Sequence, residues 1–193
     1  MDQSIITDYP TIYPQLEAKC KEIGFSMPSD VYIGTLLKTL ITAKPGGNFL
    51  ELGTGIGLSL SWMIDGMDQQ ARITSIDNDP ALCEIARTFF GQNPQVDILC
   101  VDGSEWIKNY QGDQFDLIFA DAWPGKYSEL NETLALVKVG GLYVIDDMNP
   151  QANWQEGHQA KAQQLITELE NRSDINLTKM DWSSGVMICT KKA

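Results

Sequence analysis

Apolar positions along the chain follow two spacings. Short runs rich in β-branched residues alternate with segments where apolar residues recur every three or four positions, as on one face of a helix. The short runs predict strands at residues 49–52, 72–76, 96–101, 115–120, 142–145, 175–180 and 185–190. Helical spacing covers residues 30–41, 57–67, 80–90, 130–137 and 162–169. Such alternation predicts an α/β fold with a mainly parallel sheet.

The last two predicted strands are separated only by a short turn around residues 183–185. A parallel pair needs a long crossover, so these strands form an antiparallel hairpin. We therefore expect a Rossmann-like, seven-stranded, mostly parallel sheet with an antiparallel C-terminal hairpin and helices on both faces. A length of 193 residues suits a single domain.

A glycine-rich turn follows the first predicted strand and precedes a helix. Glycine permits the tight turn and a close approach of the backbone to a ligand. The spacing is GxGxG with an acidic residue before it, whereas the nicotinamide fingerprint is GxGxxG. S-adenosylmethionine (SAM) lacks a pyrophosphate but carries an ammonium and a sulfonium, which favour a nearby carboxylate. We predict that this turn binds SAM through Glu51, Gly53, Thr54, Gly55, Gly57 and Ser59.

Polar residues also follow the second and third predicted strands. Asp77 is placed to accept the ribose hydroxyls of a nucleotide-like ligand, with Asn78 beside it. Asp102, Gly103 and Ser104 follow the third strand, where a polar group can meet the adenine amino group. For both aspartates the alternative is simple capping of the next helix.

From about Met27 onward the sequence resembles the small-molecule O-methyltransferase family that includes the catechol and caffeoyl-CoA enzymes, which have the class I methyltransferase fold. The resemblance rests on residues 28–37, 49–59, 115–121 and 140–147. It implies one catalytic domain over residues 1–193, with a helical extension at 1–26 and a catalytic core at 27–193. It also implies that Asp121, Asp146 and Asp147 hold a divalent cation, Mg²⁺ or Ca²⁺, which binds the acceptor oxygens. Asp121 is expected to lie at the cofactor as well.

The charges at this edge of the sheet also favour a cation. The fourth and fifth strands end at the same edge of the sheet, and three carboxylates there repel one another unless a hard cation intervenes. The alternative is that one or two of them bind the SAM ammonium or cap a loop without any metal.

The sequence departs from the family's pattern at two positions. The family usually has Asn where Asp147 stands, and a Lys where Pro124 stands. The nearest lysine here is Lys126, for which three roles remain open: general base, partner of an acidic substrate group, or exposed side chain.

The loop that follows Asp147 contains His158, the one histidine of the chain. An imidazole titrates near neutral pH and can take a proton from a hydroxyl. The candidate catalytic residues are therefore Lys126, His158 and Asp147, the alternative for His158 being an idle position at the start of the next helix. Trp123 is a candidate to pack on adenine, and Trp154 to cover a planar acceptor or to pack the loop.

The net charge and the cysteine content limit the kinds of molecule that the protein can bind. The net charge of −12 argues against nucleic acid and anionic membranes, which require a basic face. The four cysteines show no metal-ligand spacing, and no signal peptide or membrane span is visible. We expect a cytoplasmic enzyme that acts on a small-molecule acceptor, with residues 5–25 able to pack on a second copy as a homodimer.

The functional prediction is SAM-dependent O-methylation of a small-molecule hydroxyl with help from a divalent cation. Four alternatives remain open: a metal-independent N- or C-methyltransferase, an NAD-dependent oxidoreductase, an aminopropyl transferase, and a SAM-binding module without catalysis. The missing lysine at Pro124 keeps the last of these open.

Overall fold

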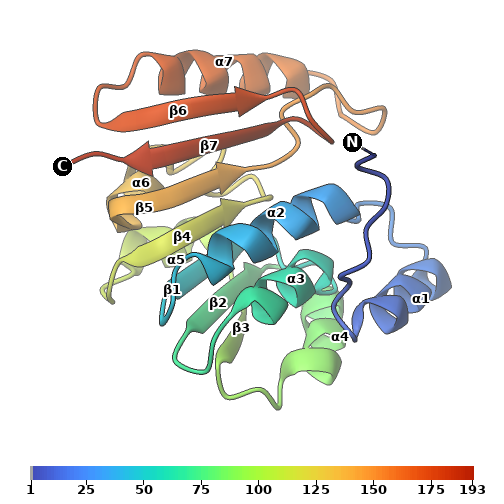
Figure 1. Cartoon of the computed structure of the whole chain (residues 1–193). Coiled ribbons are helices and arrows are strands. Elements are labelled where there is room, and N and C mark those ends of the chain that lie inside the picture. Colours follow the sequence, from blue (N-terminus) through green and yellow to red (C-terminus); the bar gives the residue numbers. More distant parts are fainter. Residues whose placement is uncertain (1) are drawn as a thin grey trace.

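The computed structural model describes residues 2–193 and contains one seven-stranded sheet in the order β3-β2-β1-β4-β5-β7-β6 (Figure 1). The strands β1 to β5 are parallel, and β7 pairs antiparallel with both β5 and β6. The predicted terminal hairpin is thus confirmed. The strands are β1 Asn48–Leu52, β2 Arg72–Asp77, β3 Val96–Cys100, β4 Phe115–Ala120, β5 Val137–Ile145, β6 Ile175–Met180 and β7 Val186–Lys191.

Seven helices cover the two faces of this sheet (Figure 1). The first four pack on one face, where Leu37 and Trp62 contribute to its hydrophobic cluster, and the last three pack on the other, with Leu165 in the second cluster. They are α1 Tyr13–Ile23, α2 Val31–Thr42, α3 Leu58–Gly66, α4 Pro80–Phe90, α5 Gly103–Asn109, α6 Leu130–Leu136 and α7 His158–Glu170. Helices on both faces explain why β1 and β4 are buried along almost their whole length.

The start of β5 differs from the sequence prediction. Val137 continues the apolar spacing of the helix before it, but it begins β5 and pairs with Phe115 of β4. The β4–β5 register shifts after Phe115, and Gly140 follows with a φ of 76°. Because this start is irregular and contains glycine, the sequence pattern does not indicate the first five residues of β5 as a strand. Helix α5 was expected only through the possible cap at Asp102, because its seven residues are too few to show a clear helical period.

The N-terminal extension is part of the hydrophobic core. Leu16 of α1 is fully buried, and the ring of Tyr13 meets that of Trp62 edge-on at 5.5 Å. These residues contact their own chain, so the predicted dimer contact of this segment stays a prediction. Among the described residues, no helix combines the length and apolar character that crossing a membrane requires.

The cap of α4 provides a test of the local structure. Asp79 accepts hydrogen bonds from the backbone N–H groups of Ala81 and Leu82 at 2.8 and 3.3 Å, as its Asp-Pro sequence predicts. Asp79→Ala should lower the free energy of unfolding by about 1 kcal/mol, because two helix N–H groups lose their partner. Urea denaturation measures this, with Glu84→Ala on the exposed side of the same helix as the control. Equal losses in both variants would contradict the capping role.

Candidate active site

The glycine turn lies at the carboxyl end of β1, as predicted. Gly53, Gly55 and Gly57 all have positive φ values, of 106°, 52° and 95°. At Gly53 a Cβ atom would lie 2.9 Å from the backbone oxygen of Asp121, so a larger residue would collide with the start of the β4–α6 loop. The turn therefore requires glycine both for its backbone angles and for this close approach.

A buried polar network supports the turn from below. The fully buried Glu51 accepts hydrogen bonds from the hydroxyls of Ser59 and Ser75 at 2.6 and 2.5 Å, one on each carboxylate oxygen. The hydroxyl of Thr54 lies 2.6 Å from that of Ser75. Burial raises the pKa of Glu51 to about 7. Glu51, Thr54 and Ser59 thus shape the turn from within, and their direct contact with SAM stays a prediction.

Asp77 is joined to the turn at the end of β2. Its carboxylate accepts hydrogen bonds from the backbone N–H groups of Gly55 and Asp79, at 2.8 and 2.9 Å. Asn78 beside it is exposed. The half-buried Asp77 therefore lies where a ligand over the turn can reach it, as its predicted role at the ribose requires.

The residues after β3 have structural roles. Asp102 caps α5 by accepting a hydrogen bond from the N–H of Glu105 at 2.9 Å, which confirms the capping alternative. Ser104 donates to Glu129 at 2.6 Å, and Gly103 is buried against Pro124. Contact of Asp102, Gly103 or Ser104 with adenine stays a prediction.

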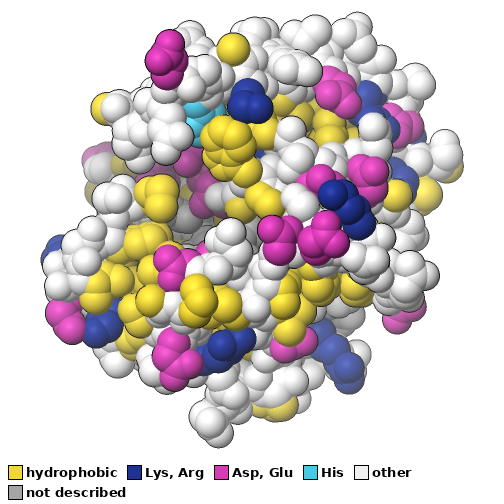
Figure 2. All heavy atoms as spheres, turned by 180° about the vertical axis from the view of Figure 1, so that it is seen from behind, with side chains coloured by type: hydrophobic (Ala, Val, Ile, Leu, Met, Phe, Trp, Pro, Cys, Tyr) yellow, Lys and Arg dark blue, Asp and Glu magenta, His cyan; other side chains and the backbone are white. Residues whose placement is uncertain are grey.

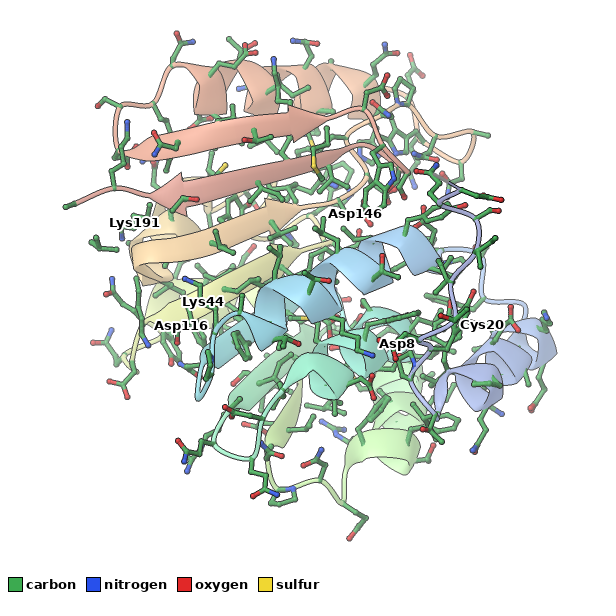
Figure 3. All side chains as sticks on the ribbon, viewed as in Figure 1. Asp8, Cys20, Lys44, Asp116, Asp146 and Lys191 are labelled. Carbon is green, nitrogen blue, oxygen red and sulfur yellow. The ribbon has the colours of Figure 1, made fainter. Side chains whose placement is uncertain are left out.

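The three aspartates of the predicted cation site end β4 and β5 at the same edge. Figure 3 labels Asp146 at this edge, with Asp116, Lys44 and Lys191 at the opposite end of the strands. Asp146 is 2 % exposed, and Asp121 and Asp147 are partly buried. Burial raises the pKa of all three carboxyls, that of Asp146 to about 6, and the charge of Asp146 further raises the pKa of Asp121. Burying several carboxyl groups at this edge therefore makes each of them harder to ionise.

Serine hydroxyls from two distant segments bind these carboxylates. Ser29, just before α2, donates to Asp121 at 3.2 Å, and Ser184 in the β6–β7 turn donates to Asp146. Neighbouring Ser183 in turn donates to Asp30, the N-cap of α2. The sequence indicated a turn at 183–185 but gave no signal that it reaches the site.

Lys126 is buried at the same edge, with 4 % of its surface exposed, which excludes the exposed-lysine alternative. Its ammonium donates a hydrogen bond of 2.5 Å to the backbone oxygen of Asp146. Burial lowers the pKa of Lys126, while the charges of Asp121, Asp147 and Asp146 oppose that change. The ammonium is therefore part of the charge arrangement that contains the three aspartates.

The predicted cation site of Asp121, Asp146 and Asp147 stays a prediction. Within residues 2–193, no group of three or more histidine, cysteine, aspartate or glutamate side chains is arranged to hold a metal ion. Asp146 Oδ1 is already occupied, because it accepts from the N–H of Asp147 at 2.8 Å and from Ser184. Protein donors therefore satisfy part of the hydrogen-bonding capacity of Asp121 and Asp146.

Asp147 has a left-handed backbone, with a φ of 54°. Aspartate and asparagine are the side chains that adopt this conformation most readily after glycine. The departure from the family's usual Asn therefore preserves the backbone of the turn while it adds a negative charge.

An aromatic group lies beside this acidic edge. Trp154 stacks on His158 with ring centroids 4.1 Å apart and an interplanar angle of 14°, and His158 Nε2 lies 3.0 Å from the hydroxyl of Tyr127. Trp123 lies 5.6 Å from both Tyr127 and His158 and is 47 % exposed. Figure 2 shows the one histidine, in cyan, among hydrophobic side chains and near acidic ones. His158 is thus held in place by its neighbours, and Trp123 belongs to the same aromatic group; its packing on adenine stays a prediction.

Tyr127 is the functional candidate that the sequence reasoning missed. It follows Lys126 in the loop after β4, and only the return of α7 to that loop brings it to His158. No periodicity or spacing in the sequence signals this contact.

Comparisons with known proteins agree with this geometry. The sequence model of the O-methyltransferase family matches residues 6–192. A protein of Mycobacterium ulcerans assigned as an O-methyltransferase is 30 % identical over 118 residues, which is 58 % of this chain and 53 % of that protein. The matched region therefore spans about half the length of such curated relatives.

Solved structures share the fold over almost the whole chain. The O-methyltransferase of Bacillus cereus, in complex with SAH, has a TM-score of 0.80 at 20 % identity and covers 97 % of this chain and 93 % of its own. The O-methyltransferase of Streptomyces achromogenes involved in tomaymycin synthesis, in complex with SAM, has a TM-score of 0.83 at 18 % identity, with 98 % and 93 % covered. The class I methyltransferase fold is thereby confirmed.

The buried Glu51 predicts a pH-dependent contribution to stability. Because its pKa is raised in the folded state, the folded chain holds this proton more tightly than the unfolded chain. Glu51 therefore stabilises the fold below about pH 4.5, and this contribution is lost as the pH rises to about 7. Glu51→Gln should remove that loss, which amounts to a few kcal/mol at most. Denaturation of both proteins at several pH values measures the difference, and a difference that does not change between pH 4.5 and 7 would refute the assignment.

Proposed function

Because this chain belongs to the O-methyltransferase family, we propose that it transfers the methyl group of SAM to the hydroxyl oxygen of a small molecule. The observation that carries the proposal is the glycine turn joined to Asp77 at the carboxyl edge of a sheet with this strand order. Open α/β sheets bind their ligands at that edge. The SAH and SAM complexes of the structural neighbours support the choice of cofactor.

The cofactor's charges fit this edge of the molecule. SAM carries an ammonium and a sulfonium, and the proposed site is bordered by the carboxyl groups of Asp77, Asp121 and Asp147. In the proposed complex Asp77 accepts the ribose hydroxyls, and the left-handed glycines let the backbone approach the methionine part. An anionic pyrophosphate would face the same carboxylates, which disfavours the NAD alternative.

Methyl transfer is an in-line displacement at the methyl carbon. The C–S bond breaks, sulfur keeps its electron pair to give SAH, and the new bond forms to the acceptor oxygen, whose proton must leave. We assign His158 as the base that accepts this proton, because its ring is held in place by Trp154 and Tyr127. Burial, together with the charge of Lys126, lowers its pKa, which keeps the imidazole neutral and able to accept a proton near pH 7.

The acceptor belongs on the aromatic side of the site. Trp123 is the most exposed member of the aromatic group, and its ring offers a flat surface next to His158. A small molecule with a hydroxyl on or near a planar group fits this surface.

All four cysteines are free thiols, which supports the cytoplasm as the proposed place of action.

Ligand binding separates the methyltransferase from the oxidoreductase alternative. At a concentration 100 times its dissociation constant, SAM or SAH should stabilise the fold by about 2.7 kcal/mol, which raises the Tm by about 5–10 °C, whereas NAD should have no effect.

Asp77→Ala should weaken SAM binding about tenfold or more, since it removes the acceptor of the ribose hydroxyls. Calorimetry measures this, with Asp97→Ala on the exposed part of β3 as the control. Unchanged affinity in Asp77→Ala would argue against the site.

The proton acceptor is tested through kinetics. His158→Gln keeps a polar group near Tyr127 but cannot serve as a base, so kcat should fall by about 10²–10⁴-fold while SAM affinity is retained. The rise of the rate with pH that reports the imidazole should also vanish. Formation of SAH with catechol and related phenols as probe acceptors measures both effects, and a variant with normal kcat would exclude His158 as the base.

A further inference from the structure

The buried ammonium of Lys126 is the least expected feature of the site. A lysine that is 4 % exposed needs its charge balanced, because desolvation of an unpaired cation is costly. Its Nζ donates to the backbone oxygen of Asp146 and lies 5.1 Å from the centroid of the Tyr127 ring. A carbonyl and an aromatic face both interact favourably with a cation.

The carboxylates at this edge supply the balancing charge without contacting Lys126 directly. Asp121, Asp146 and Asp147 each interact with its charge, although none forms an ion pair with it within the described residues. The Asp121 and Asp146 side chains bind Ser29 and Ser184 instead. One fixed cation therefore faces three carboxyl groups that the protein itself holds apart.

A divalent cation does not fit this arrangement. Mg²⁺ and Ca²⁺ need carboxylate oxygens that are free to coordinate them. Oδ1 of Asp146 is instead taken up by the N–H of Asp147 and the hydroxyl of Ser184, and a hydroxyl of Ser29 binds Asp121. An ion between these aspartates would also lie close to a buried ammonium, which repels it. The metal that the family resemblance implies thus disagrees with the side chains that are present.

We propose that Lys126 takes the place of the divalent cation. The positive charge at the site is then that of the lysine ammonium, and no metal ion is needed there. The inference rests on the proposed methyl transfer and deepens it. The sequence change that accompanies it is the loop Trp123-Pro124-Gly125-Lys126, in which the lysine stands two positions later than in the family pattern. The buried Gly125, with a φ of 81°, turns this loop so that Lys126 reaches the end of β5.

Manganese binding tests the proposal without any need for enzyme turnover. Mn²⁺ is titrated into the 193-residue chain with SAH present, and free Mn²⁺ is followed by electron paramagnetic resonance. We expect no binding to the wild-type protein beyond that of a buffer control. Lys126→Met keeps most of the side chain but removes the charge, and should bind Mn²⁺ at least about tenfold more tightly than the wild type.

Two further variants separate charge from packing. Lys126→Arg disturbs the packing but keeps the charge, and should not gain Mn²⁺ binding, while Lys161→Ala removes an exposed lysine nearby on α7 and should behave as the wild type. Stoichiometric Mn²⁺ binding by the wild-type protein would overturn the proposal, whatever the stability of the variants. Equal Mn²⁺ binding by Lys126→Met and Lys126→Arg would overturn it as well. Calorimetry with SAH on the same wild-type sample tests the proposed function separately. If the wild-type protein does not bind SAH, the proposed function is contradicted, whatever the result with Mn²⁺.

Discussion

Burial of charge at the carboxyl edge of the sheet is the constraint on which the rest of this site depends. β1, β2, β4 and β5 end side by side there, and they bring Glu51, Asp77, Asp121 and Asp146 to one region. Because burial penalises ionised carboxylates, each of these side chains requires donors from the protein. Serine hydroxyls and backbone N–H groups provide them.

This requirement explains why segments far apart in the sequence meet at the site. The β6–β7 turn sends Ser183 to Asp30 and Ser184 to Asp146, so the antiparallel hairpin joins the start of α2 to the end of β5. The loop after β4 adds the ammonium of Lys126 and the ring of Tyr127, and α7 returns His158 to the same place. The proposed site is therefore built from groups that already hydrogen-bond to one another.

Most of the fold could be predicted from the sequence, because it depends on local patterns. The glycine turn, the Asp79 cap and the terminal hairpin follow from spacing and turn residues alone. The site could be predicted only in part. The strand-end aspartates were found because parallel strands end at a common edge, but the roles of Ser29 and Tyr127 depend on contacts between distant segments. Burial of Lys126 was likewise invisible, since a loop lysine carries no signal of where its ammonium points.

In the proposed complex SAM binds over the glycine turn, at an edge of the sheet whose cation is Lys126. A crystal structure of the protein grown with SAH and MnCl₂, with anomalous data collected at the manganese edge, tests it most directly. The account predicts SAH over residues 53–57 with its ribose on Asp77, the ammonium of Lys126 on the Asp146 carbonyl, and no anomalous peak among Asp121, Asp146 and Asp147. An anomalous peak between those aspartates, or SAH bound elsewhere, would contradict it.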